Sequence, residues 1–145
     1  MSEKAVIFDI DGTLSDRRHR LHYLEKKKDW KSFFDNLNFA PPIKASFDFL
    51  FDHLNQGHKV ILLTGRPEEY REKTVRWLKK HRVQPEMYEL FMRETKNFES
   101  DVSLKERLFR THSSDLNVIK VYDDNPKLIE LWRSLGLSVI NCSVD

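Results

Sequence analysis

The sequence predicts a single α/β domain built on a five-stranded parallel sheet with helices on both faces. Five short segments rich in Val, Ile, Leu and Phe alternate along the chain with segments of helical periodicity. Four of the five apolar segments show little alternation of polar and apolar residues, which is typical of strands buried on both faces of a parallel sheet. A chain of 145 residues has room for one such domain, spanning 1–145, and none for a large cap domain.

The strands are predicted from composition and from their order along the chain. The third apolar segment mixes polar and apolar residues, so this strand is expected nearer an edge of the sheet than the others. Alternation of strand and helix implies right-handed crossovers between parallel strands. The expected strands are Lys4–Phe8, Lys59–Leu63, Tyr88–Met92, Val118–Tyr122 and Leu137–Ile140.

Four helices are predicted from apolar stripes and from signals at their ends. Gly57 follows the first stripe, as glycine often does after the last turn of a helix. Asn125-Pro126 is an N-cap followed by proline at the first helical position. The expected helices are 42–56, a segment opened by Pro67, a segment marked by Leu104 and Leu108 that begins near Asp101, and a segment from Pro126 to Gly136.

Residues 14–40 do not fit this alternation. They contain a further amphipathic stretch and are expected to form a small helical insertion or lid, too short to fold independently as a cap. Trp30 and Tyr23 could stack on a nucleic-acid base. Trp30, however, shares a helical stripe with Phe33, Phe34 and Leu37, which favours core packing.

Composition excludes several classes of protein. No apolar run approaches the roughly 20 residues that span a bilayer, and the N-terminus lacks a secretory signal. The single cysteine excludes an internal disulfide and, with these absences, indicates a cytoplasmic protein. The net charge of +2 does not by itself indicate nucleic acid, but seven Lys or Arg lie within 17–31. That stretch is either a solvated surface or a guide for a nucleic-acid backbone.

Polar side chains follow the predicted strands where the strands end. In a parallel sheet these side chains meet at the carboxyl edge, where open α/β sheets bind ligands. Two like charges about 4 Å apart repel by roughly 4 kcal/mol even at an effective dielectric of 20, so clustered carboxylates favour a bound cation. Oxygen ligands alone favour Mg²⁺. The strand-end residues are Asp9, Thr64-Gly65-Arg66, Arg93 and Asp123-Asp124.

The segment after the first strand carries the sharpest chemical signal. Asp9 and Asp11 are two residues apart in an extended chain, so both can address one ligand. One carboxylate can act as a nucleophile and the other as proton donor and acceptor. Gly12 lets the backbone turn closely, and backbone N–H groups there can bind phosphate oxygens. The alternative interpretation of this segment is a simple cation-binding turn.

Asp9-Ile10-Asp11-Gly12-Thr13, followed by Thr64, Lys105 and Asp123-Asp124, resembles the four motifs of the haloacid dehalogenase (HAD) superfamily of phosphatases. The resemblance implies that Asp9 is the nucleophile and Asp11 the general acid and base. It also implies that Thr64 and Lys105 bind phosphate. Mg²⁺ would be held by Asp9, the backbone carbonyl of Asp11, Asp123 and, directly or through a water, Asp124.

Three basic residues of this predicted site have alternatives. Lys96 competes with Lys105 for the position beside the nucleophile, because 93–105 resembles a loop of uncertain register. Arg66 and Arg93 can grip phosphate with two hydrogen bonds. Each could instead form a structural ion pair with one of the aspartates.

A narrower resemblance is to the 3′-phosphatase half of bacteriophage polynucleotide kinase-phosphatases. The residues that carry it are Leu62–Arg66, Met92-Arg93, Asp101 with Lys105-Glu106, Asp123–Asn125 and the Leu131-Trp132-Arg133 run to Gly136. The P-loop motif of a kinase is absent from this chain. The expected function is Mg²⁺-dependent removal of 3′-phosphate from DNA or RNA ends. The alternatives are a nucleotide monophosphatase, a receiver-like phosphoacceptor domain and an inactive binding module.

Overall fold

The computed structural model describes residues 3–25 and 28–144 and confirms the predicted α/β class. Its five strands form one sheet in the order β3-β2-β1-β4-β5, and every neighbouring pair is parallel. The strand Tyr88–Arg93 lies at an edge, as its mixed composition predicts. The strands are β1 (Lys4–Phe8), β2 (Lys59–Pro67), β3 (Tyr88–Arg93), β4 (Asn117–Asp123) and β5 (Val139–Asn141).

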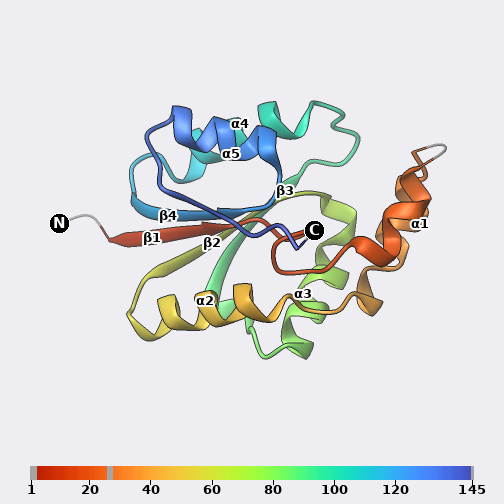
Figure 1. Cartoon of the computed structure of the whole chain (residues 1–145), viewed down its shortest axis with the longest axis horizontal. Coiled ribbons are helices and arrows are strands. Elements are labelled where there is room, and N and C mark those ends of the chain that lie inside the picture. Colours follow the sequence, from red (N-terminus) through yellow and green to blue (C-terminus); the bar gives the residue numbers. More distant parts are fainter. Residues whose placement is uncertain (1–2, 26–27, 145) are drawn as a thin grey trace.

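Helices cover both faces of the sheet (Figure 1). Successive residues of β1 point to opposite faces, so Val6 and Phe8 join the core beneath α2 and α3. Ala5 and Ile7 join the core beneath α4 and α5. The four helices are α2 (Lys44–Asn55), α3 (Arg71–Lys80), α4 (Asp101–His112) and α5 (Pro126–Ser134).

Some element boundaries differ from the expected ones. β2 continues past Leu63 to Pro67, because Pro67 still pairs with Arg93 of β3 after a shift in register. Pro67 therefore ends a strand, and a 3₁₀ helix (Glu68–Tyr70) leads into α3. Helix α5 has the expected N-cap, since the Asn125 side chain accepts a hydrogen bond from the backbone N–H of Lys127.

The described part of residues 14–40, the range predicted to be a small helical insertion or lid, contains three short helical segments, and we refer to this range as the insertion. It contains a 3₁₀ helix (Arg18–Leu24), the short helix α1 (Trp30–Asp35) and a 3₁₀ turn (Leu37–Phe39). Phe33, Phe34 and Leu37 form a third hydrophobic cluster, separate from the two cores of the sheet. In Figure 1, α1 stands beyond the carboxyl ends of the strands.

Two lysines of the basic stretch, Lys26 and Lys27, lie outside the described residues. Among the residues that are described, no helix has the length and apolar character needed to cross a membrane.

Candidate active site

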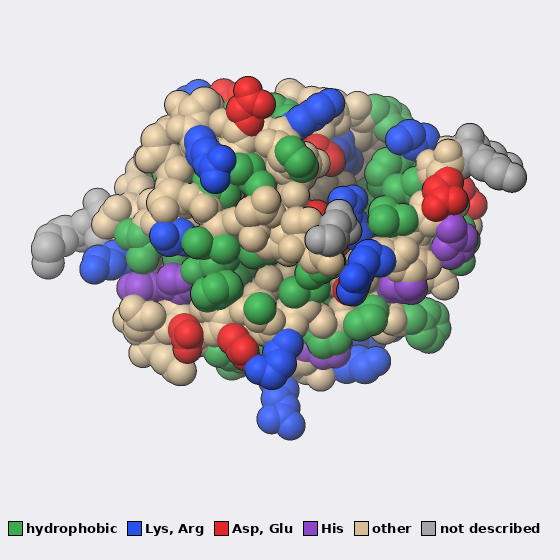
Figure 2. All heavy atoms as spheres, viewed as in Figure 1, with side chains coloured by type: hydrophobic (Ala, Val, Ile, Leu, Met, Phe, Trp, Pro, Cys, Tyr) green, Lys and Arg blue, Asp and Glu red, His purple; other side chains and the backbone are tan. Residues whose placement is uncertain are grey.

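The carboxyl ends of β1, β2 and β4 border a cavity of about 640 Å³. Of the residues predicted for the site, only Asp123 does not line this cavity, and it is buried directly beneath it beside Asp124. Figure 2 shows the surface hollowed next to the insertion, with acidic and basic side chains at the opening. The parallel topology thus brings together side chains that lie up to 115 positions apart in the sequence, from Asp9 to Asp124.

Three carboxylates meet at the base of the cavity. One oxygen each of Asp9, Asp123 and Asp124 lies within 4.8 Å of the others, and we name these residues the carboxylate cluster. The ammonium group of Lys105 lies 2.5 Å from Asp9 Oδ1 and 3.8 Å from Asp123 Oδ2. Together with Arg17, which pairs with Asp124 at 3.3 Å, Lys105 leaves the three ionised carboxylates with one negative charge in excess.

The electrostatics of the carboxylate cluster reflect this imbalance. Burial raises the pKa of Asp9 well above its usual range; Lys105 opposes the shift and the other two carboxylates add to it. Burial also raises the pKa of Asp124. Although burial opposes the charged form of Lys105, Asp9 and Asp123 raise the pKa of its amine. A cluster of oxygen ligands with excess negative charge fits a hard divalent cation.

Asp123 is fixed in place by the polypeptide itself. The indole Nε1 of Trp132 donates a hydrogen bond of 3.1 Å to Asp123 Oδ2. Asp123 Oδ1 accepts hydrogen bonds from the backbone N–H groups of Asp124 and Asn125, at 2.8 and 3.1 Å. Trp132 is a core residue, as its helical stripe predicts, and it also orients a member of the carboxylate cluster.

Gly12 lets the chain pass close to Asp124. Its φ of +93° is a conformation that favours glycine, and a Cβ there would lie 2.1 Å from Asp124 Oδ2. The next residue, Thr13, is buried, and its hydroxyl lies 3.3 Å from Asp9 Oδ2 and 3.4 Å from Asp124 Oδ1. The turn after β1 therefore packs directly against the carboxylate cluster.

Asp11 lies between two buried arginines. Arg66 donates two hydrogen bonds to its carboxylate, at 2.8 and 2.9 Å, and a third to Thr74. Arg20 donates another at 3.0 Å, and its guanidinium group also stacks over the ring of Phe33. Burial opposes ionisation of Asp11, but Arg66 and then Arg20 outweigh it and lower the pKa of this carboxyl group.

Thr64, Gly65 and Arg93 surround the cavity from β2 and β3. The buried hydroxyl of Thr64 accepts a hydrogen bond from the backbone N–H of Arg66 and retains its own proton for a ligand. Arg93 donates to the carbonyl of Gly65 at 2.9 Å and pairs with Asp101 at 2.6 Å. Both candidate phosphate-binding arginines thus make the ion pairs that the sequence left as an alternative, while still lining the cavity.

The structure distinguishes the two candidate lysines. Lys105 is buried against Asp9, one turn along α4 from Asp101. Lys96 is exposed at the rim of the cavity, on a residue with a φ of +62°.

Two arginines of the basic stretch belong to the site and were not singled out by the sequence. Arg20 is fully buried against Asp11, and Arg17 pairs with Asp124 at 3.3 Å. Seven basic residues within 17–31 look alike in the sequence, so no local signal separates these two from their neighbours.

Comparison with known proteins agrees with this geometry. The family model of the polynucleotide kinase PNKP phosphatase domain matches residues 3–145. The chain belongs to the family of PNKP phosphatase domains. It is therefore a phosphatase of the HAD type, and the receiver-like and inactive alternatives are set aside.

Relatives of this PNKP-type domain include longer proteins. The chain is 28% identical over 142 residues to the "Putative bifunctional polynucleotide kinase/RNA ligase" of Autographa californica nuclear polyhedrosis virus, covering 94% of the chain and 19% of that protein. It is 31% identical to a protein in the solved Pnkp1/Rnl/Hen1 complex, with a TM-score of 0.83, covering 98% of the chain and 46% of that protein. The chain thus spans less than half the length of these relatives.

A more distant structure shows the fold alone. The class C acid phosphatase of Bacillus anthracis, solved with tungstate bound, has a TM-score of 0.71 at 17% identity, covering 99% of this chain and 67% of that one.

Proposed function

We propose that this PNKP-type domain removes 3′-phosphate from polynucleotide ends through a phosphorylated Asp9 intermediate and with bound Mg²⁺. The observation that carries the proposal is the position of Asp9, which lines the open cavity between Lys105 and two further carboxylates. The family of the chain supports phosphoryl transfer. The relatives named for polynucleotide kinase and RNA ligase activity, and for a complex in RNA repair, support a polynucleotide substrate.

In the first step an oxygen of Asp9 attacks phosphorus, and the bond from phosphorus to the 3′ oxygen breaks. The leaving oxygen takes a proton from Asp11, giving the free 3′-hydroxyl and an aspartyl phosphate. Lys105 and the Thr64 hydroxyl would bind phosphoryl oxygens and neutralise their charge. The ammonium group is already held at this position by Asp9 and Asp123.

In the second step water attacks the aspartyl phosphate. Asp11 accepts the proton of that water, inorganic phosphate leaves, and Asp9 regains its carboxylate. The two arginines that hold Asp11 favour its ionised form, which suits proton acceptance in this second step. The proton that Asp11 gains here is the one that it gives to the leaving oxygen in the next first step, and the same two arginine pairs oppose that protonated state. Asp9, Asp123, Asp124 and the Asp11 backbone carbonyl are the groups that would hold Mg²⁺, whose charge would balance the cluster and the phosphoryl group.

A nucleotide monophosphatase is the second candidate, because a cavity of about 640 Å³ lies within the range that accommodates a whole small molecule. The deciding experiment is a phosphate-release assay with 3′-phosphorylated oligoribonucleotides and oligodeoxyribonucleotides, against 3′- and 5′-mononucleotides. We expect kcat/KM to be at least ~10-fold higher for an oligonucleotide. Equal values for oligonucleotide and mononucleotide would favour the nucleotidase.

A further inference from the structure

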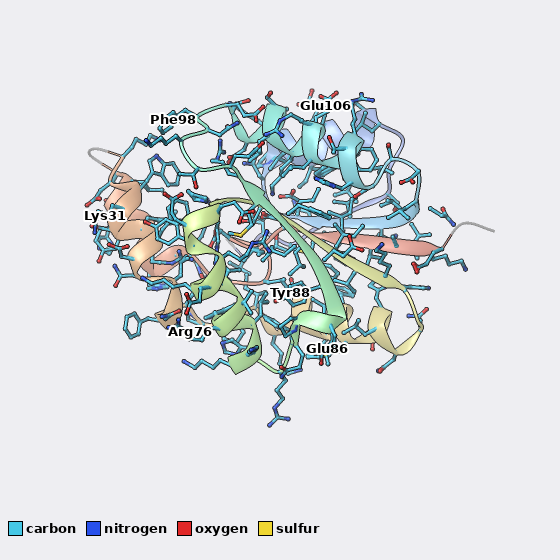
Figure 3. All side chains as sticks on the ribbon, turned by 180° about the vertical axis from the view of Figure 1, so that it is seen from behind. Lys31, Arg76, Glu86, Tyr88, Phe98 and Glu106 are labelled. Carbon is cyan, nitrogen blue, oxygen red and sulfur yellow. The ribbon has the colours of Figure 1, made fainter. Side chains whose placement is uncertain are left out.

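Two aromatic side chains are exposed at the rim of the cavity. Phe98 has 91% of its surface exposed and Trp30 has 47%. They come from segments far apart in sequence, the β3–α4 loop and α1, and both line the same cavity as Asp9. Figure 3 shows Phe98 and Lys31, the neighbour of Trp30, at the same end of the molecule.

The loop that carries Phe98 is held rigidly. Arg107 of α4 pairs with Glu94 at 2.8 Å and with Glu99 at 2.5 Å, bracketing Phe98. Arg93 also donates a hydrogen bond of 2.6 Å to the backbone carbonyl of Glu99. Burying a phenyl ring would stabilise the fold, yet this braced loop holds the ring of Phe98 in solvent. The arrangement suits a ring that gains its contacts from a ligand.

Trp30 has the form of a supported platform. Its ring stacks on Phe34 with centroids 5.7 Å apart and meets the edge of Phe33 at 5.6 Å. Phe34 in turn contacts Tyr70 at 5.0 Å. The indole is thus supported on one side by the insertion's own cluster, while about half of its surface stays open. Its helical stripe favoured core packing; Tyr23, the other candidate for stacking, packs into that cluster instead.

Basic side chains accompany the two aromatic rings. Arg17, Lys31 and Lys96 line the same cavity; Arg17 also pairs with Asp124, and Lys31 with Asp35. Of the acidic side chains on this rim, Glu94 and Glu99 are already paired with Arg107. Aromatic platforms among cationic groups are the combination that binds single-stranded nucleic acid, because every base offers a π-face and every linkage a negative charge.

We propose that Trp30 and Phe98 stack on the unpaired bases next to the 3′-phosphate, so that the substrate is a single-stranded or frayed 3′ end. The inference rests on the proposed function and specifies its substrate. Bases paired at a blunt duplex end have their faces covered by neighbouring pairs and are not free to stack on both rings.

The test compares two 3′-phosphorylated oligonucleotides of equal length and charge, one normal and one abasic at its last two positions. With the parent protein we expect kcat/KM to be ~10-fold lower for the abasic substrate, since stacking contributes roughly 1–3 kcal/mol per base. We expect a recessed 3′-phosphate in a duplex to be hydrolysed less efficiently than the single strand. Glycerol phosphate, which has no base, serves as a separate probe of phosphatase activity.

Single substitutions test which aromatic rings account for the preference for the normal over the abasic oligonucleotide. Phe98→Leu and Trp30→Leu keep an apolar side chain but remove the aromatic face, and each should reduce the normal-to-abasic ratio by at least ~3-fold. Phe39→Ala is the matched control, because Phe39 is also an exposed aromatic of the insertion, at 75%, but does not line the cavity. It should keep the ratio of the parent. Thermal melting of each variant reports whether the fold is intact, and Trp30→Met, which also lacks an aromatic face, replaces Trp30→Leu if the latter unfolds.

The outcomes separate the two proposals. A parent protein that releases phosphate equally well from normal and abasic oligonucleotides retains the proposed function and overturns the stacking inference. A parent that hydrolyses glycerol phosphate but no 3′-phosphorylated oligonucleotide overturns both. A ratio that falls equally in Phe39→Ala and Phe98→Leu also overturns the inference.

Discussion

Asp9 and Asp11 follow the same strand, two residues apart, and both line the cavity, but their surroundings are opposite in charge. Asp9 shares one lysine with two other carboxylates, and its pKa is raised by burial and by Asp123 and Asp124. Asp11 is buried between two arginines, which lower its pKa. The comparison teaches that the fold itself provides the counter-charges of Asp11, whereas it leaves the carboxylate cluster with excess negative charge, as the proposed cation site requires.

The largest effect is expected from removing Asp9, the proposed nucleophile. Asp9→Asn keeps the shape of the side chain but cannot form the covalent intermediate, so turnover should fall by ~10³-fold or more, about 4 kcal/mol in the barrier. Single-turnover phosphate release measures this, with mass spectrometry to exclude deamidation back to aspartate. Asp48→Asn, which removes an exposed pair with Lys44 on α2 away from the cavity, is the control and should keep full activity. Substantial turnover by pure Asp9→Asn would remove the distinction between the two aspartates.

The next effect concerns the arginines beside Asp11. Arg20→Gln leaves a buried carboxylate with only one of its two guanidinium partners, and we expect a loss of about 3 kcal/mol in the free energy of unfolding. Arg18→Gln is the matched control two residues away, because its pair with Asp16 lies at the surface, and it should cost less than ~1 kcal/mol. Urea unfolding of both variants measures the difference. Equal losses would mean that Asp11 does not depend on a built-in counter-charge.

Cation binding should depend on the carboxylate cluster, the surroundings of Asp9. Chelation should abolish turnover, and Mg²⁺ at about 100 times its dissociation constant should stabilise the fold by roughly 2.7 kcal/mol. Asp123→Asn should diminish that stabilisation, whereas Asp11→Asn, which retains the backbone carbonyl, should largely preserve it. Thermal unfolding with and without Mg²⁺ measures each response. Full activity in excess chelator would contradict the proposed cofactor.

The smallest effect concerns how the free energy of unfolding depends on pH when a chelator has removed any bound metal. Asp9 and Asp11 should contribute slopes of opposite sign. The folded pKa of Asp11 is lowered, so its contribution to stability is present above the unfolded value of 3.8 and is lost as the pH falls through the folded pKa. The folded pKa of Asp9 is raised, so stability is instead lost as the pH rises from 3.8 through the folded pKa.

Each substitution should remove its own slope: Asp11→Asn should abolish the loss of stability at acid pH, and Asp9→Asn should abolish the loss of stability as the pH rises above the unfolded value. Urea unfolding between pH of about 2 and about 7 measures both slopes, that of Asp11 below pH of about 4 and that of Asp9 above it. Slopes of the same sign would show that the two carboxylates share one electrostatic environment.

The sequence predicts the parts of the site that strand ends determine. Asp9, Thr64 and Asp123 follow from apolar segments and from the rule that parallel strands meet at one edge. Lys105 follows from its place at the start of a helix and from the HAD resemblance. Strand and helix periodicity therefore accounts for most of the fold, apart from ends such as that of β2.

The parts that could not be predicted depend on contacts between separate segments. Arg20 is buried because the insertion packs a third cluster around it, and its ring contact with Phe33 has no counterpart in a local pattern. Trp30 looked like a core residue because periodicity tells which residues share a face but not what covers that face. The surroundings of Arg20 and Trp30 therefore depend on tertiary packing, which a local sequence pattern does not encode.

Arg20 also joins the insertion to the chemistry. Its guanidinium group holds Asp11 with one nitrogen and the backbone carbonyl of Phe33 with another, so the insertion's cluster and the proposed proton-transfer residue share one side chain. If the insertion frays, its arginine leaves with it, and Asp11 loses a partner at the moment when Trp30 is also displaced. A change in the insertion's cluster would therefore reach Asp11 through a single side chain, with no residue at the ends of the strands altered.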